Sequence, residues 1–222
     1  MDRTVIVSMN IVVVGANGQI GNQLVHLIKE DGQHNVKAMI RKEEQVKSFE
    51  NSGIQTVLAN LEDSVENLAK EIEGSDAICF TAGSGGSTGH DKTLLIDLDG
   101  AVKMMESAEK AGIKRFILVS ALQANNRENW SDEIKPYYVA KHYADRILEN
   151  SPLTYTIIRP GGLLNEPGNG KIRTGDTIKA GTIPREDVAR TILACLTNEA
   201  NYNRSFDLIS GDTPIEEALN QL

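Results

Sequence analysis

The sequence has few of the residues that build disulfide frameworks or metal sites. Its 222 residues include two cysteines, Cys79 and Cys195, which are far apart and each lie in an apolar stretch. We interpret both as small buried hydrophobic residues of a protein in a reducing cytoplasm. Because no histidine has metal-ligand spacing to carboxylates or cysteines, we predict no metal site; the four histidines are His26, His34, His90 and His142.

Long apolar runs and basic clusters are also missing. No segment approaches the roughly 20 apolar residues of a membrane span, and the first residues lack the pattern of a signal peptide. The net charge of -8 and the lack of a basic run argue against binding to nucleic acid or to anionic lipid. We therefore expect small molecules, rather than nucleic acids or membranes, as partners.

What the sequence has is the composition of one globular domain. It is 40% hydrophobic and 24% charged, which suits a single sizeable core. Met9 is a candidate start, because the preceding MDRTVIVS adds nothing that the fold needs. We predict one domain over residues 9–222 and an N-terminal extension over residues 1–8.

Short β-branched runs alternate with segments of helical spacing. The strand candidates are residues 11–14, 36–40, 56–59, 77–80, 116–119 and 155–158. Because these runs are apolar throughout, they indicate a parallel sheet that is covered by helices on both faces. The predicted fold class is α/β, doubly wound, and the glycine-rich stretch 83–89 is predicted to be a loop at the carboxyl edge of the sheet, where ligands bind.

A glycine loop, GANGQIG, lies at residues 15–21 between the first strand and a helical segment. Gly15 would permit a tight turn, Gly18 would let the backbone approach a pyrophosphate, and Gly21 would let helix and strand pack closely. The free N–H groups of the helix would then bind phosphate. We predict a dinucleotide site, the alternative being a tight turn without a ligand; its residues are Gly15, Asn17, Gly18, Gln19, Ile20 and Gly21.

The second predicted strand ends in Ile40-Arg41-Lys42. An NAD-preferring protein often places an acid here for the ribose hydroxyls, whereas a guanidinium suits a 2′-phosphate. Arg41 and Lys42 therefore favour NADP, with NAD as the second possibility. The alternative is that both residues begin a solvated helix.

Tyr137 and Lys141 lie four residues apart in a segment opened by Pro136, a residue suited to the first turn of a helix. They share a face, and the same stripe continues through Ala144 and Leu148. Lys141 thus projects from an apolar face and needs a partner. The alternative is an amphipathic helix with a snorkelling lysine, and Tyr138 could compete with Tyr137 for a role.

Together these features resemble the short-chain dehydrogenase/reductase superfamily, and within it the compact atypical members that are NAD(P)-binding and epimerase/dehydratase-like. The resemblance covers nearly the whole chain from Met9. It rests on GANGQIG, CFTAG (79–83), IDLDG (96–100), KRFILVS (114–120), Tyr137 with Lys141, and RPG (159–161).

The resemblance implies a catalytic set. Tyr137 would exchange a proton with a carbonyl or alcohol, while Lys141 would bind the cofactor ribose and make the phenol more acidic. Ser120 would bind the substrate oxygen, although relatives with two serines often use the second, which here is Ala121. Asp97 would either organise a proton-relay water beside Lys141 or only accept backbone hydrogen bonds.

The resemblance also implies further cofactor contacts. Asn60 and Leu61 would lie beside the adenine, although relatives usually carry Asp at the position of Asn60. The nicotinamide ribose would be bordered by a short segment at the end of the fourth strand, and a residue at the end of the sixth strand would add a contact; these residues are Thr81, Ala82, Gly83 and Pro160. A monomer and a homodimer are both permitted.

The predicted substrate side comprises residues 160–182 and 203–222, of which 163–178 would border the cleft, whereas 183–189 would be a mainly structural helix entry. Residues 128–130 would form either a substrate-side loop or an aromatic packed on its own loop. The favoured function is an NADP-dependent oxidoreductase for a small carbonyl, alcohol or flavin-like substrate. The alternatives are an NADP(H)-binding redox sensor, a quinone or flavin reductase that needs no tyrosine acid, and an epimerase/dehydratase; sugar-nucleotide epimerisation is disfavoured for lack of a large carboxyl-terminal domain.

Overall fold

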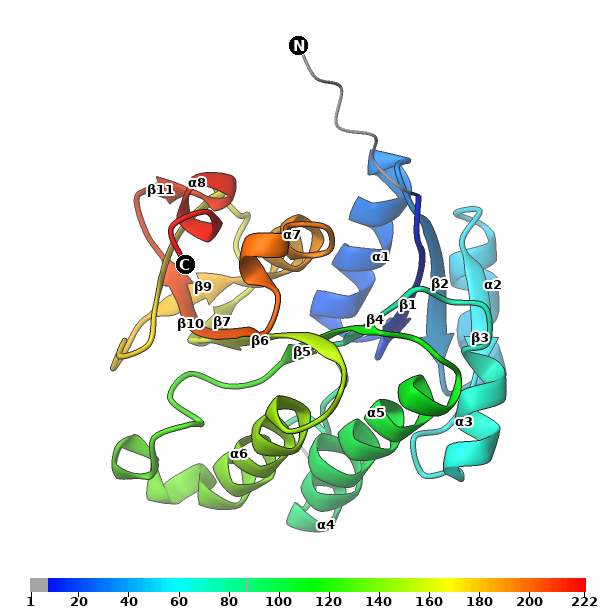
Figure 1. The fold of residues 1–222 in the computed structure, drawn as a ribbon, viewed down its shortest axis with the longest axis horizontal. Helices are drawn as coiled ribbons and strands as arrows, with labels where there is room; N and C mark the ends of the chain where they lie inside the picture. The colour runs from blue at the N-terminus through cyan, green and yellow to red at the C-terminus, as the bar shows by residue number, and fades with distance from the viewer. Residues whose placement is uncertain (1–7, 87) are drawn as a thin grey trace.

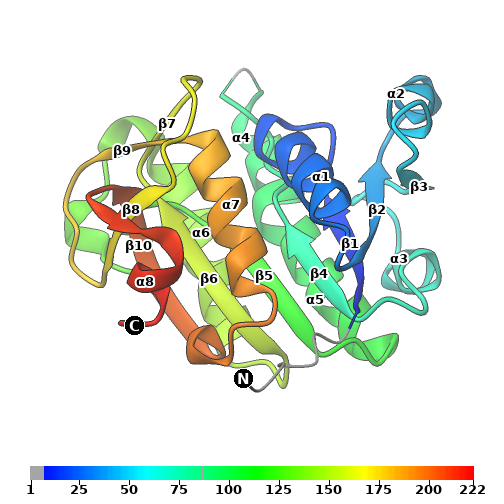
Figure 2. The same cartoon turned by 90° about the horizontal axis from the view of Figure 1, so that it is seen from above.

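A nine-stranded sheet forms the centre of the protein (Figures 1 and 2). The computed structural model describes residues 8–86 and 88–222, so most of the predicted extension, and Ser87 of the glycine-rich loop, lie outside the described residues. The strand order is β11-β8-β10-β6-β5-β4-β1-β2-β3. Seven neighbouring strands are parallel: β1 (Asn10–Val14), β2 (Asn35–Ile40), β3 (Gln55–Leu58), β4 (Ala77–Phe80), β5 (Arg115–Val119), β6 (Thr154–Pro160) and β10 (Arg204–Ser210).

Apolar side chains on both faces of the central strands explain the helical layers. Ile11 and Val13 of β1 pack into one hydrophobic cluster, together with α1 (Gln19–Asp31) and α7 (Arg185–Cys195). Val12 and Val14 point to the opposite face and pack into a second cluster. That face is covered by α3 (Val65–Glu71), α5 (Ala101–Lys110) and α6 (Lys135–Glu149). The doubly wound α/β fold is confirmed.

Five strands were not predicted, and all of them lie beyond residue 160. The two longest are β10 and β8 (Lys171–Gly175). Strand β8 runs antiparallel to β10. Polar residues interrupt the apolar pattern of both, which removes the signal that marked the other strands. The other three are β7 (Gly162–Leu164), β9 (Thr182–Pro184) and β11 (Thr213–Pro214).

The short helical elements lie mostly in the connections. They are α2 (Val46–Glu50), α4 (His90–Lys92), α8 (Ile215–Leu219) and a π-helical segment, η2 (Thr93–Gly100), with 3₁₀ turns η1 (Glu43–Gln45), η3 (Arg127–Asn129), η4 (Asp132–Ile134) and η5 (Glu199–Asn201). In residues 8–86 and 88–222, no helix combines the length and the apolar character needed to cross a bilayer.

The strand order places β1 and β4 side by side at the centre of the sheet. The chain leaves β1 toward β2 on one side, whereas β4 leads to β5 on the other side. In such sheets the crevice outside the carboxyl ends of the two central strands is where ligands bind. GANGQIG follows β1, and residues 81–83 follow β4, so both predicted cofactor segments lie at this crevice.

Candidate active site

Two of the three glycines of the loop are needed for close contacts. Gly15 has a φ of +81°, and a Cβ at this position would lie 2.6 Å from the Cα of Ala82. A Cβ on Gly21 would overlap with the carbonyl oxygen of Gly15 and lie 2.7 Å from Oγ1 of Thr81. The N–H of Gly18 donates to the Gly15 carbonyl (2.9 Å). Side chains at Gly15 and Gly21 would therefore force the strand, the loop and the helix apart.

The loop leaves the amino terminus of α1 open to a ligand. Helix α1 begins at Gln19 with Gly18 as its N-cap, and neither a side-chain cap nor an acidic residue in its first turn is present. The first N–H groups of the helix thus have no intrahelical partner and carry partial positive charge. They face an open cavity of about 420 Å³ whose lining residues are Asn17, Gly18, Gln19, Asn22, Gln23 and Asn165.

Gln23 lines this cavity and also carries a buried acceptor. Oε1 of Gln23 is buried and has no hydrogen-bond partner among the described residues. A dinucleotide carries phosphates that the free N–H groups at the start of α1 can bind. The residues present therefore fit a dinucleotide.

The segment after β4 joins the loop to the rest of the site. The backbone N–H and the hydroxyl of Thr81 both donate to the Val14 carbonyl (2.9 Å each). Ala82 lies against Gly15, and a Cβ on Gly83 would lie 3.1 Å from Oδ1 of Asp97. Thr81, Ala82 and Gly83 thus line the crevice between the two central strands, and their contact with the nicotinamide ribose stays a prediction.

Arg41 and Lys42 are exposed just after β2. Their backbone N–H groups donate to Oε1 of Gln45 (3.3 and 3.1 Å), which fixes the chain at this turn. Lys42 also pairs with Glu44 (3.2 Å) and caps the 3₁₀ turn η1, whereas no carboxylate within the described part of the chain pairs with Arg41. Lys42 is therefore engaged locally, and Arg41 remains the available cation.

Asn60 and Leu61 follow β3 at the same edge of the sheet. The side-chain oxygen of Asn60 accepts from the N–H of Glu62 (3.1 Å), so this side chain closes a local turn. Leu61 is largely buried in the cluster beneath α3 and α5. The position agrees with the resemblance, and the adenine contact stays a prediction.

Tyr137, Lys141 and Asp97 lie together, with Lys141 and Asp97 buried and Tyr137 half-buried. Lys141 lies one turn after Tyr137 on α6 and is 3% exposed. Its ammonium lies 3.3 Å from Oδ1 of Asp97, 3.2 Å from the carbonyl oxygen of Val119 and 5.6 Å from the centre of the Tyr137 ring. The partner that the apolar stripe required is therefore Asp97, and Tyr137 rather than Tyr138 lies beside the ammonium.

The pKa values of Lys141 and Tyr137 are both raised, for different reasons. Burial alone would lower the pKa of Lys141, but Tyr137, Asp97 and Asp145 outweigh it and raise that pKa. Burial raises the pKa of Tyr137, and Lys141 lowers it again only in part. The site thus keeps an ammonium beside a protonated phenol.

Asp97 is positioned by an unusual helical turn. It lies in η2, whose π-helical hydrogen bonding widens the helix, a feature that often marks functional sites. Its Oδ2 accepts from the N–H of Ser84 (2.9 Å). One carboxylate thus connects the loop after β4 with Lys141, and the backbone hydrogen bond matches one of the two predicted roles.

Ser120 directly follows Val119, the last residue of β5, whose carbonyl oxygen accepts from Lys141. The N–H of Ser120 donates to the carbonyl of Ile158 (2.8 Å), and the N–H of Leu122 donates to the carbonyl of Pro160 (3.0 Å). Residues 120–122 therefore run alongside the last residues of β6. The Ser120 side chain is 3% exposed; its hydroxyl lowers the pKa of the neighbouring Asp145, which burial raises. The predicted catalytic role of Ser120 and the cofactor contact of Pro160 stay predictions.

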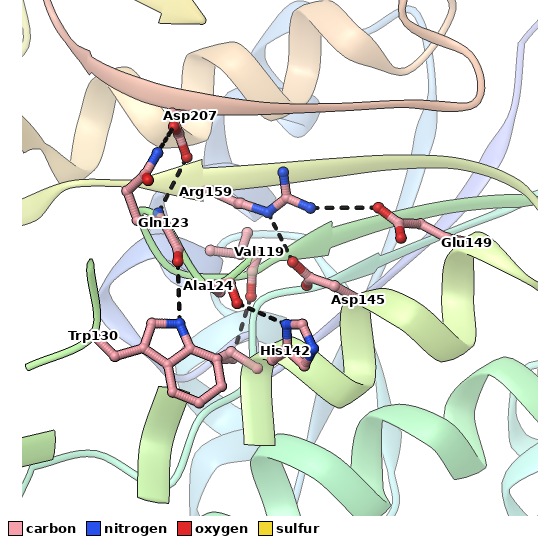
Figure 3. A network of polar contacts seen from close by, with 10 residues as sticks. Val119, Gln123, Ala124, Trp130, His142, Asp145, Glu149, Arg159 and Asp207 are labelled. Carbon is pink, nitrogen blue, oxygen red and sulfur yellow. Dashed lines mark hydrogen bonds and ion pairs between the residues drawn. The ribbon is translucent and has the colours of Figure 1, made fainter. Parts of the chain in front are cut away.

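A buried ion pair beneath the site was missed. Arg159, 2% exposed, donates to Asp145 (2.8 Å) and lies 3.4 Å from Glu149 (Figure 3). Asp145 continues the stripe of Tyr137 and Lys141 by another four residues, and this spacing could have revealed it. The pair places a second carboxylate behind Lys141.

A second unpredicted network is centred on Gln123, which is buried with a φ of +60°. Its side-chain amide and backbone N–H both donate to the Asp207 carboxylate of β10, and its carbonyl accepts from the indole of Trp130 (3.2 Å) (Figure 3). Trp130 stacks on Tyr138 with ring centres 5.8 Å apart and meets the edge of His142. Trp130 thus packs on α6 rather than on its own loop, and a substrate-side role of residues 128–130 stays a prediction.

Comparisons with known proteins agree on the type of protein. A family model described as NAD(P)H-binding matches residues 15–199. A Bacillus subtilis protein, named uncharacterized sugar epimerase YhfK, is 61% identical over 214 residues, which are 96% of this chain and 100% of that protein. The solved structure of the oxidoreductase ylbE from Lactococcus lactis has a TM-score of 0.88 at 37% identity, covering 96% of each chain. ChuY, an anaerobillin reductase from Escherichia coli O157:H7, has a TM-score of 0.78 at 26% identity, covering 91% of this chain and 98% of that chain.

Proposed function

The chain belongs to the NAD(P)H-binding family as an atypical short-chain dehydrogenase/reductase, and from this premise we propose that it is an NADP-dependent oxidoreductase. Its substrate would be a small carbonyl, alcohol or flavin-like molecule, and it would act in the cytoplasm as a monomer or homodimer. Two similar structures are named as an oxidoreductase and as a reductase, which supports this reaction class.

One chain of contacts carries the proposal. Gly15 lies against Ala82, Gly83 lies against Asp97, and Asp97 lies 3.3 Å from Lys141. The phosphate-binding loop and the candidate proton donor are therefore linked by a few residues. A binding protein without turnover has no need of a buried ammonium beside a phenol at this place, because burying a charge is costly.

The residues of the site can supply a proton for carbonyl reduction. Bound NADPH would supply a hydride to the carbonyl carbon. Tyr137, whose raised pKa keeps the phenol protonated at neutral pH, would donate its proton to the carbonyl oxygen. Lys141 would stabilise the phenolate that forms, while Asp97 and Val119 hold the ammonium in place.

Arg41 supports the choice of NADP. It is exposed at the end of β2, beside the strand that leads into the glycine loop. A planar guanidinium can bind a 2′-phosphate through two parallel hydrogen bonds. Lys42 is already paired with Glu44, so Arg41 would make the main contact.

The test is titration of the protein with NADPH and with NADH, followed by nicotinamide fluorescence. We expect NADPH to bind more tightly, Arg41→Ala to weaken NADPH binding about tenfold, a loss of about 1.4 kcal/mol, and NADH binding to stay unchanged. Lys42→Ala is the matched control and should have a smaller effect. If the wild-type protein binds neither nucleotide, the proposal is wrong.

Turnover distinguishes an enzyme from a redox sensor. In a screen of carbonyl and flavin substrates, Tyr137→Phe should lower the rate of carbonyl reduction about 10² to 10⁴-fold, whereas Tyr138→Phe should retain it. The reduction rate should stay level through neutral pH and fall only above the usual pKa of tyrosine, because burial raises the pKa of Tyr137 and keeps the phenol protonated. Activity that survives Tyr137→Phe would indicate a flavin or quinone reductase, and nucleotide binding without any turnover would favour a sensor.

A further inference from the structure

The cavity at the amino terminus of α1 has a second wall. Asn165 lies across from the glycine loop, although about 145 residues separate them in the chain. Every side chain that lines the cavity is uncharged. If this cavity receives the diphosphate of the dinucleotide, as the proposed function requires, two negative charges would meet only neutral groups and backbone N–H groups.

A small parallel ribbon brings a cation to this wall. Strands β7 and β9 pair so that Leu164 lies opposite Pro184. Asn165 directly follows β7 and Arg185 directly follows β9. Nη1 of Arg185 donates to Oδ1 of Asn165 (2.7 Å). Arg185 is also the first residue of α7, which lies beside α1 on the same face of the sheet (Figure 2).

Arg185 has capacity for a further anion. A guanidinium offers five N–H donors, and Asn165 takes one of them. Within residues 8–86 and 88–222, no carboxylate forms an ion pair with Arg185. Arg190, one turn further along α7, differs because Glu186 binds it through both Nε and Nη2.

We propose that Arg185, oriented by Asn165, binds the diphosphate of the dinucleotide from the wall opposite α1. The chemical class that it recognises is a nucleotide diphosphate ester, whichever group the adenosine 2′ position carries. The β7–β9 ribbon then takes part in cofactor binding. This inference rests on the proposed function, and it gives the cofactor two independent cationic contacts, Arg41 at the 2′-phosphate and Arg185 at the diphosphate.

The test compares Arg185→Gln with Arg190→Gln by titration of NADPH, NADH and adenosine 2′-monophosphate, which lacks the diphosphate. We expect Arg185→Gln to raise the Kd of NADPH and NADH by the same factor, about tenfold. Arg185→Lys should recover part of the loss, since Lys retains the charge but not the fork of donors. Arg190→Gln should bind all three ligands as the wild type does.

Several results would overturn the inference while leaving the proposed function intact. Unchanged Kd values for both dinucleotides in Arg185→Gln would show that the guanidinium makes no contact. An equal loss for adenosine 2′-monophosphate would show a general effect on the fold or on the surface charge, and circular dichroism melting checks the fold directly. Failure of the wild-type protein to bind any dinucleotide would instead overturn the proposed function, and this inference with it.

Discussion

Helices α1 and α7 lie side by side and both begin at the carboxyl edge of the sheet (Figure 2), yet their first turns carry opposite residues. The first turn of α1 has no acidic residue and no side-chain cap. The first turn of α7 contains Glu186 and Asp187. Two amino termini with the same partial positive charge are therefore used in different ways.

The carboxylates of α7 bind the protein's own chain. Asp187 is fully buried and accepts from the N–H groups of Gly170 (2.9 Å) and Asn169 (3.1 Å). Glu186 accepts from the N–H of Gly168 (2.9 Å). These acids fix the loop before β8 and leave no room for an anionic ligand, whereas the neutral first turn of α1 leaves its N–H groups available.

The largest effect is expected from the buried acid of α7. Asp187→Ala removes a buried carboxylate that accepts from two backbone N–H groups and should lower the free energy of unfolding by about 3 kcal/mol, as measured by urea denaturation. Glu186→Gln, at a partly exposed site with one such contact, should cost less than half of this. Equal losses in the two variants would contradict the distinction between them.

The reaction rates of the two cysteine thiols can show which part of the structure is loosened in Asp187→Ala. Burial raises the pKa of Cys195, on α7, and of Cys79, on β4, to about 12, so at pH 8 only about one thiol in ten thousand is a thiolate. Both should react slowly with a disulfide reagent in the folded wild type. Asp187→Ala should accelerate the reaction of Cys195 more than that of Cys79, measured one at a time in Cys79→Ala and Cys195→Ala backgrounds.

Gly21→Ala should act on ligand binding more than on stability. The added Cβ would overlap with the Gly15 carbonyl, so the loop must move, and the Kd of NADPH should rise about a hundredfold, or about 2.7 kcal/mol. Gly32→Ala is the control, because Gly32 has a φ of +68° and open space around it. It should lower stability by about 1 kcal/mol without changing Kd.

The smallest change tests the comparison most directly, by giving α1 an acid in its first turn. Gln19→Glu should stabilise the protein slightly, by about 0.5 kcal/mol, and weaken NADPH binding several-fold through repulsion of the phosphates. Gln33→Glu makes the same charge change beyond the other end of α1 and should leave the Kd unchanged. Tighter binding in Gln19→Glu would mean that the amino terminus of α1 does not meet the phosphates.

The elements up to residue 160 could be predicted because their signals are local. Apolar runs revealed six strands of the sheet, the glycine spacing revealed the loop, and the four-residue spacing placed Tyr137 and Lys141 on one face. In each case, neighbouring residues in the sequence determine the structure. The approach of Asp97 to Lys141 followed only from the family resemblance.

The unpredicted parts depend on contacts between distant segments. Arg159 is buried only because α6 places Asp145 above β6, and Arg185 reaches Asn165 only after β7 pairs with β9. The sequence also gave no sign that Gln123 adopts a positive φ, since glutamine seldom does so. Such residues require the folded arrangement before their partners are known.

The packing of Trp130 gives the protein a built-in optical reporter. It is the only tryptophan in the sequence; it stacks on Tyr138, meets the edge of His142 and is hydrogen-bonded to Gln123. Through Gln123 it is connected to Asp207, which also accepts from the N–H of Ile178 (3.2 Å). Its emission spectrum, recorded without any attached dye, should therefore respond when either α6 or the segment before β9 changes position.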